Sequence, residues 1–257
     1  MGDTNFSEMP DVAAAIPESK IAVRLLMASA MLASVAGAVI VGQIGNVFEM
    51  PPNFADMPLQ PSPEYLARYN AAISEMLSRN YSIHFAIIGA LLGLAIGMIG
   101  AVGNRIRSLV AASIGGALAA AIGGFLLGLA AAYSVQVNHG ESISLFGVKI
   151  EPIVQTTALQ CFIWSLVGIG IGCGWTIAVW GPKQIVNGIE GGLIGGLLAG
   201  VFHSMFAASV FSGSNAFSFV PEKQMERIVW AAICGASICF GLIYSVANRL
   251  QTGRALI

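Results

Sequence analysis

Two ionisable side chains, Glu190 and His203, lie within a single apolar stretch of the sequence. A carboxyl group and an imidazole are the groups that most often transfer protons or bind cations in proteins. Inside a lipid bilayer such groups are costly, because a charge at the midplane costs roughly 2.5–3.5 kcal/mol on insertion scales. We therefore take Glu190 and His203 as the candidate intramembrane polar residues.

The spacing of these two residues argues against a direct proton relay between them. They are 13 positions apart, which is about 220° around a helix, so they point to different faces. For Glu190 we weigh an anchor near the membrane surface, paired with Arg107 or Lys183, against a transport role. For His203, placed near the middle of its helix, we weigh an interhelical hydrogen bond against the same role. The remaining polar residues of the apolar stretches are also expected to bond across helices: Gln43, Asn46, Gln160, Thr176 and Asn187.

The rest of the sequence carries no pattern of an enzyme or of a cofactor site. It has no His-Glu-x-x-His zinc motif, no phosphate-binding loop and no Gly-x-Ser-x-Gly nucleophile motif. The cysteines all fall inside apolar runs, which favours small packing residues over disulfides or a metal site. They are Cys161, Cys173, Cys234 and Cys239. The sequence therefore predicts a non-catalytic protein with no cofactor and no metal.

Composition places these residues in a membrane protein. Of the 257 residues, 56% are hydrophobic and only 10% are charged, whereas a typical soluble domain has about 25% charged residues. The formal net charge of −1 provides no basic surface for nucleic acid. We therefore expect the lipid bilayer as the environment and exclude nucleic acid as a partner.

Six apolar stretches reach the roughly 20 residues that a membrane-spanning helix needs. They cover residues 25–47, 83–103, 109–135, 158–180, 185–211 and 228–247. Because every backbone N–H and C=O must be satisfied within lipid, such stretches predict helices and not barrel strands. The predicted fold class is all-α, a polytopic bundle of six transmembrane helices over 25–247. A disordered tail (1–24) and a C-terminal tail (248–257) flank it, and we expect the first helix to be retained and not cleaved as a signal peptide.

The distribution of basic residues orients the chain. On the side of both termini, the connections carry Lys20, Arg24, Arg105, Arg107, Lys183, Arg249 and Arg254. The opposite side has longer loops that carry eight acidic residues: Glu49, Asp56, Glu64, Glu75, Glu141, Glu151, Glu222 and Glu226. The positive-inside rule therefore predicts that both termini are cytoplasmic, in a cell inner membrane.

Residues 49–80, before the second span, are expected to leave the membrane on the side opposite the termini. Prolines are frequent between residues 49 and 63, which predicts an extended and not a helical segment. Residues 64–80 place Leu66, Tyr69 and Ile73 on one helical face. This pattern predicts an amphipathic helix lying on the membrane or on the bundle, with a direct continuation of the second span as the alternative.

Two shorter features lie on this same side of the membrane. Residues 142–151 alternate weakly and predict a small hairpin. Asn80-Tyr81-Ser82 matches the pattern of a glycosylation acceptor. Because it abuts the second span, we expect this match to be fortuitous.

Small residues recur every four positions in the predicted spans. The glycines among them are Gly89, Gly93 and Gly97, then Gly116, Gly124 and Gly128, and finally Gly188, Gly192, Gly196 and Gly200. Residues four apart share one face of a helix, and a face without side chains lets a neighbouring backbone come close. Glycine costs about 1 kcal/mol relative to alanine in a helix, so long rows of it indicate a packing use. We predict that these ten glycines are helix-packing positions.

The rows also repeat along the chain. An offset of 76 residues places Gly115-Gly116 on Gly191-Gly192 and Ala119-Ala120 on Gly195-Gly196. This similarity is compatible with helix-hairpin repeats.

Two functional hypotheses follow. Dense small-residue packing and scarce intramembrane charge favour a structural or assembly module of a membrane complex, with other membrane proteins or further copies of itself as partners. The repeat, together with Glu190 and His203, favours a small transporter or channel.

Overall fold

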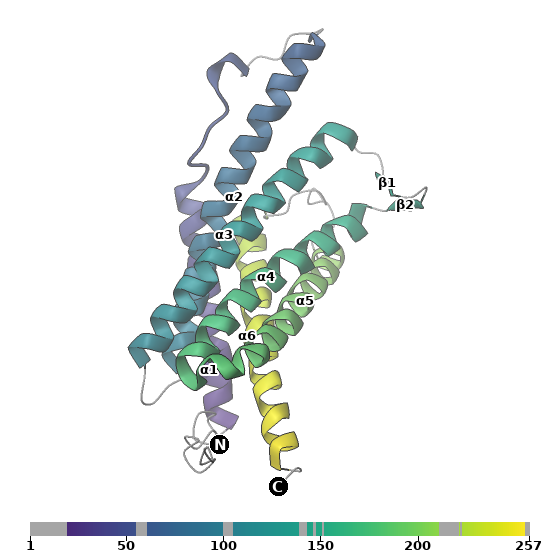
Figure 1. Ribbon diagram of the computed structural model, residues 1–257. Coiled ribbons are helices and arrows are strands. Elements are labelled where there is room, and N and C mark those ends of the chain that lie inside the picture. Colours follow the sequence, from purple (N-terminus) through teal and green to yellow (C-terminus); the bar gives the residue numbers. More distant parts are fainter. Residues whose placement is uncertain are drawn as a thin grey trace, which may run out of the picture.

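The computed structural model describes residues 20–54, 61–99, 105–138, 143–145, 148–150, 152–210, 221 and 223–254. Among them are six helices long and apolar enough to cross a membrane. These are α1 (Lys20–Ile44), α2 (Pro63–Ile99), α3 (Arg105–Asn138), α4 (Pro152–Trp180), α5 (Ile185–Val210) and α6 (Gln224–Arg254). The chain is an all-α polytopic membrane protein, as predicted (Figure 1).

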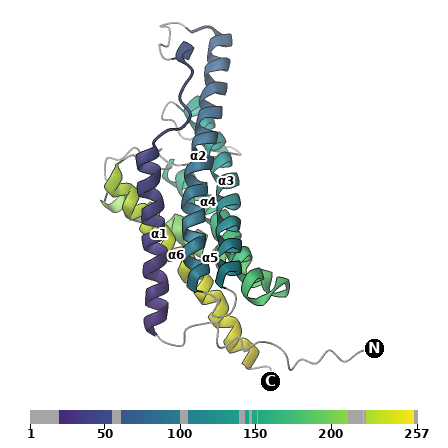
Figure 2. The same cartoon turned by 90° about the vertical axis from the view of Figure 1, so that its left-hand side faces the viewer.

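The helices form a closed ring, in which each helix packs against its neighbours in the sequence and α6 packs against α1. Consecutive helices run in opposite directions (Figures 1 and 2). One end of the bundle, called here the terminus side, holds the start of α1 and the end of α6. The other end, the loop side, holds the start of α2 and two short strands, β1 (Ile143–Leu145) and β2 (Val148–Ile150).

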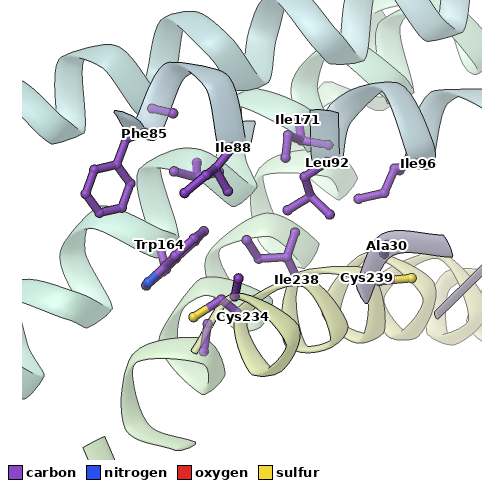
Figure 3. Packing of buried hydrophobic residues seen from close by; sticks show 14 of the residues in the cluster. Ala30, Phe85, Ile88, Leu92, Ile96, Trp164, Ile171, Cys234, Ile238 and Cys239 are labelled. Atoms are coloured by element: carbon purple, nitrogen blue, oxygen red, sulfur yellow. The ribbon is translucent and has the colours of Figure 1, made fainter. Parts of the chain in front are cut away.

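Even-numbered helices lie nearer the centre of the ring than odd-numbered ones. The buried share of each apolar span is 50%, 56% and 56% in α2, α4 and α6, but 33%, 28% and 44% in α1, α3 and α5. At the centre, the rings of Phe85, Trp164 and Trp230 contact one another with centroids 5.2 to 5.8 Å apart. Aliphatic side chains such as Leu92 and Ile238 continue this core toward the terminus side (Figure 3).

The odd-numbered helices turn rows of bulky apolar residues outward. On α3 the exposed row consists of Ile106, Val110, Ile114, Leu118 and Ile122. Residues four apart lie on one face of a helix. In a bilayer this face meets lipid, while the small residues of the same helix face the bundle.

Helix α2 is longer than the predicted second span. Its 37 residues extend about 55 Å at 1.5 Å per residue, against about 30 Å of hydrocarbon. Residues 64–80 therefore continue the spanning helix, and the prediction of a separate amphipathic helix on the membrane is wrong. The apolar face of this part packs within the bundle, because Leu77 lies against the core and the buried Ser78 faces Gly128 of α3.

Helical structure also extends beyond other predicted boundaries. The proline-rich segment contains a short 3-10 turn, η3 (Pro52–Phe54), although we expected no helix there; residues 55–60 lie outside the described residues. Helix α1 begins at Lys20 and α6 continues to Arg254, so both predicted tails are partly helical and the expected disorder is wrong for residues 20–24. Nothing in the structure tests the expectation for residues 1–19, which are not among those described.

The predicted hairpin at 142–151 is confirmed by the two strands. Strands β1 and β2 pair antiparallel, with Ile143 opposite Ile150. The two residues between them are outside the described part of the chain.

The pair α4–α5 repeats the contacts of the pair α2–α3. A Cβ added to Gly89 would meet the carbonyl oxygen of Gly116, and one added to Gly168 would meet that of Gly192. Gly168 follows Gly89 by 79 residues, and Gly192 follows Gly116 by 76. The central Trp164 likewise follows Phe85 by 79 residues. The sequence repeat is therefore matched by equivalent contacts between helices.

Candidate functional site

The ten predicted packing glycines lie where the backbones of two helices approach. A Cβ at Gly93 would meet the backbone of Ala112 on α3, and one at Gly192 would meet the carbonyl oxygen of Gly168 on α4. An added Cβ would also come closer than 3.0 Å to a backbone atom of the neighbouring helix at Gly89, Gly97, Gly116, Gly124, Gly128, Gly188, Gly196 and Gly200. Any side chain at these positions would force the two helices apart.

Helices α3 and α5 each direct two rows of small residues at two different neighbours. On α5, Gly192 faces α4, whereas a Cβ at Gly195 would lie 2.6 Å from the Cα of Ile238 on α6. On α3, Gly116 faces α2 and Gly115 faces α4. Each of these outer helices is therefore wedged between two inner helices.

A buried amide joins the aromatic residues at the centre. Gln160 is fully buried, and its Oε1 accepts hydrogen bonds from the indole N–H of Trp164 at 3.1 Å and of Trp230 at 3.4 Å. One acceptor thereby fixes two indole rings and links α4 to α6. The expectation that Gln160 bonds across helices is confirmed. Sequence patterns did not single out the two tryptophans as its partners.

His203 packs against this aromatic layer from α5. Its ring centroid lies 6.2 Å from that of Trp230, and the side chain is buried. Helix α5 ends at Val210, so His203 lies in the part of the helix near the loop side, and its predicted place near the middle is wrong. The Nδ1 atom is buried and has no hydrogen-bond partner among the described residues. That nitrogen does not form the expected interhelical bond.

Glu190 lies on a different side of α5 from His203, as predicted. The residues at positions −4, +3 and +7 from it, Val186, Leu193 and Leu197, are 55%, 41% and 45% exposed. These positions share a helical face with Glu190, whose own side chain is half-buried. Glu190 therefore borders the lipid-facing surface and does not point into the centre of the bundle.

On the loop side, α2 holds the chain that leaves α1. The Asn80 Oδ1 accepts from the backbone N–H groups of Val47 and Phe48, both at 2.9 Å, and its Nδ2 donates to the Phe48 carbonyl at 2.8 Å. One turn further on, His84 Nε2 lies 2.8 Å from the carbonyl oxygen of Gly45. Gly45 has φ +66°, which suits glycine at the end of a helix. This clamp was not predicted, because the sequence shows only that Asn80 and His84 share a face.

On the terminus side, smaller polar contacts join α5 to its neighbours. The Ser245 hydroxyl donates to the backbone carbonyl of Asn187 at 3.0 Å, which links α6 to α5. The Asn187 side chain donates to Gln184 at 2.6 Å. Thr176 donates to Gly172 within its own helix at 2.7 Å, so its expected bond across helices is not the one printed by this geometry.

Four buried serine hydroxyls lie beside glycines of neighbouring or nearby helices but have no hydrogen-bond partner within the described residues: Ser34, Ser78, Ser108 and Ser165. Ser34 lies opposite Gly235, and Ser165 lies opposite Gly196. Serine is used here for its small volume, since its hydroxyl makes no bond in this part of the chain.

The described residues contain no group of three or more His, Cys, Asp or Glu side chains placed to hold a metal ion. The candidate pair Glu190 and His203 is not brought together. No protein-family model matches the chain, and no curated protein or solved structure is significantly similar to it. The arrangement of the chain's own residues is therefore the basis for a functional proposal.

Proposed function

We propose that this chain is a non-catalytic structural or assembly module of a membrane complex. The observation that carries the proposal is the filled centre of the ring. Between α2, α4 and α6, aromatic and aliphatic side chains contact one another, and the buried Gln160 amide bonds to Trp164 and Trp230. A path for a polar solute along this axis would require displacement of that core.

The glycine rows support the same proposal. Close backbone contact replaces the hydrophobic force that lipid cannot supply between helices. In this view the ten glycines set the spacing of α2–α3 and α4–α5, and the rigid ring presents its outer helices to partners.

The alternative, a small transporter or channel, draws support from the repeat, because many transporters are built from internal repeats. Its two candidate residues fit it less well. His203 contacts the core near the loop side, and Glu190 borders the lipid-facing surface.

Orientation forms part of the proposal. The seven basic residues of the short connections and helix ends all belong to the terminus side, where α1 begins and α6 ends. By the positive-inside rule, we place this side in the cytoplasm and the chain in a cell inner membrane. A reporter that fluoresces only in the cytoplasm, fused after Ile257, should be bright; a dark reporter would reverse the orientation.

Flux measurements on the reconstituted chain test the functional proposal. Vesicles containing the purified protein should pass ions and small solutes no faster than protein-free vesicles. Extracts made in mild detergent should contain the chain in particles larger than the 26.6 kDa protomer with its detergent. Flux that is lost on Glu190→Gln or His203→Ala, with the fold retained, would instead establish a transporter.

A further inference from the structure

The repeat reveals Glu190 as an exception. Counting back 76 residues from Glu190 leads to Ile114 on α3, by the same offset that relates Gly192 to Gly116. Ile114 is 54% exposed and belongs to the lipid-facing row of α3. The position on α5 that corresponds to an ordinary lipid-facing residue therefore carries a carboxyl group.

No other acidic residue occurs in α3, α4 or α5. Glu190 is the sixth residue of α5, which places it about 7.5 Å from the start of the helix at 1.5 Å per residue. A carboxyl group at this depth and on this side costs free energy in lipid, and a cationic group at the same depth would offset that cost.

The surface around the carboxyl group has the shape of a helix-binding face. Val186, Leu193 and Leu197 surround Glu190 with exposed apolar side chains. We call these four residues the Glu190 face. Apolar contacts with one polar contact among them are the usual composition of an interface between membrane helices.

We propose that the Glu190 face binds a transmembrane helix of a partner protein that carries one lysine or arginine at the depth of Glu190. The proposal rests on the assembly function proposed above and names the surface that performs it. The basic residue selects the partner, because a helix without it gains only apolar contacts that lipid also provides.

A defined helix can serve as the probe. The full-length chain, carrying a fluorescent donor, is reconstituted in phosphatidylcholine vesicles with an acceptor-labelled leucine–alanine helix of about 21 residues. One probe has a single lysine about one and a half turns from its terminus-side end, and the matched probe has leucine there. We expect the lysine probe to associate about tenfold more tightly, the size of a polar contact between membrane helices.

The preference should disappear in Glu190→Gln and remain in Glu226→Gln, which removes a carboxyl group of α6. Equal binding of the two probes to the wild-type chain would overturn the proposal without need of any variant. It would also be overturned by a preference that survives Glu190→Gln, or by self-association of the chain that depends on Glu190, which would make a second copy the occupant. Flux through the wild-type protein would refute the assembly function itself, whereas equal probe binding without flux would refute only this surface.

Discussion

Two glycines of α3 show how differently the same residue type can be constrained. A Cβ at Gly116 would meet the carbonyl oxygen of Gly89, and a main-chain atom of a packed helix cannot move aside. A Cβ at Gly123 would lie 3.5 Å from Leu166 and 3.6 Å from Ile163, at ordinary van der Waals distance from flexible side chains. Only the first glycine is required by the packing.

Substitution by alanine should separate the two positions. Alanine gains about 1 kcal/mol over glycine in a helix interior, while overpacking costs about 1–3 kcal/mol or more. We expect Gly123→Ala to be neutral or stabilising, and Gly116→Ala to lower the free energy of unfolding by about 1–3 kcal/mol. Unfolding in mixed detergent measures both variants. Equal effects at the two sites would contradict the close approach of α2 and α3.

The buried serines allow a second comparison. Ser165 has no hydrogen-bond partner within the described residues, so its hydroxyl is buried without compensation. Ser245 is equally buried, but it donates to the Asn187 carbonyl. We expect Ser165→Ala to be neutral or to stabilise by up to about 1 kcal/mol, and Ser245→Ala to destabilise by about 1 kcal/mol. The same unfolding assay decides, and a loss at Ser165 as large as that at Ser245 would show that its hydroxyl is bonded.

Residue spacing could predict which positions of α3 and α5 are small, but not what each one meets. Gly191 and Gly192 are adjacent in the sequence, yet the first faces α6 and the second faces α4. A four-residue period describes one helix alone. The identity of the neighbour depends on the order of helices around the ring, which a period does not contain.

At the scale of elements, α2 is the helix that departs most from expectation. The apolar face formed by Leu66, Tyr69 and Ile73 suits a helix on a membrane surface as well as a helix packed on protein. In the structure Tyr69 belongs to an aromatic cluster in which Phe54 lies 5.5 Å from Tyr65 and 5.9 Å from Tyr69. The turn η3 therefore braces the projecting half of α2, a contact between segments that no local pattern reveals.

The Asn80 clamp predicts a local effect on this region. Asn80→Ala removes three hydrogen bonds to Val47 and Phe48, each ordinarily worth about 0.5–1.5 kcal/mol. We expect faster hydrogen exchange in residues 45–54 while the helices keep their protection. Hydrogen exchange with mass spectrometry measures it.

Ser82→Ala is the matched control for this experiment, because it destroys the glycosylation pattern and leaves the clamp intact. Asn80 is almost fully buried and its Nδ2 donates to Phe48, so we also expect the wild-type chain to carry no glycan there. Unchanged exchange in Asn80→Ala would show that residues 45–54 are held by other contacts.

At the scale of the whole molecule, the contact of α1 with α6 closes the ring. A Cβ at Gly235 of α6 would lie 2.9 Å from the Cβ of Ser34 on α1, slightly closer than the two Cβ atoms of a disulfide, which are about 3.5–4.5 Å apart. A small shift of either helix would bring paired cysteines to bonding geometry.

We expect Ser34→Cys with Gly235→Cys to form a disulfide under mild oxidation, in a background whose four native cysteines are replaced. Leu32→Cys with Gly235→Cys should remain reduced, because Leu32 is 70% exposed on the outer side of α1. Mass spectrometry of the linked peptides reports the bond. A disulfide in the control pair, or none in the test pair, would be incompatible with the closed ring.

The number of helices and their alternating direction could be predicted from sequence, because hydrophobic length and short connections determine both. The division into inner and outer helices could not. Phe85, Trp164 and Trp230 are three aromatic residues among many until the ring brings α2, α4 and α6 together. The repeat was visible in the small residues of α3 and α5, and the same spacing extended to the bulky residues of α2 and α4 would have paired Phe85 with Trp164.

Ring closure has a consequence for biosynthesis. A ribosome completes α1 first and α6 last, yet the face of α1 that carries Ala30, Ser34 and Ala38 is buried in the finished protein, with Ser34 opposite Gly235 of α6. Throughout translation of the intervening helices, that small-residue face lacks its mate. The nascent chain must therefore keep α1 beside the insertion machinery or in lipid until the last helix arrives, and truncation before α6 should leave α1 open to capture by other membrane helices or to degradation.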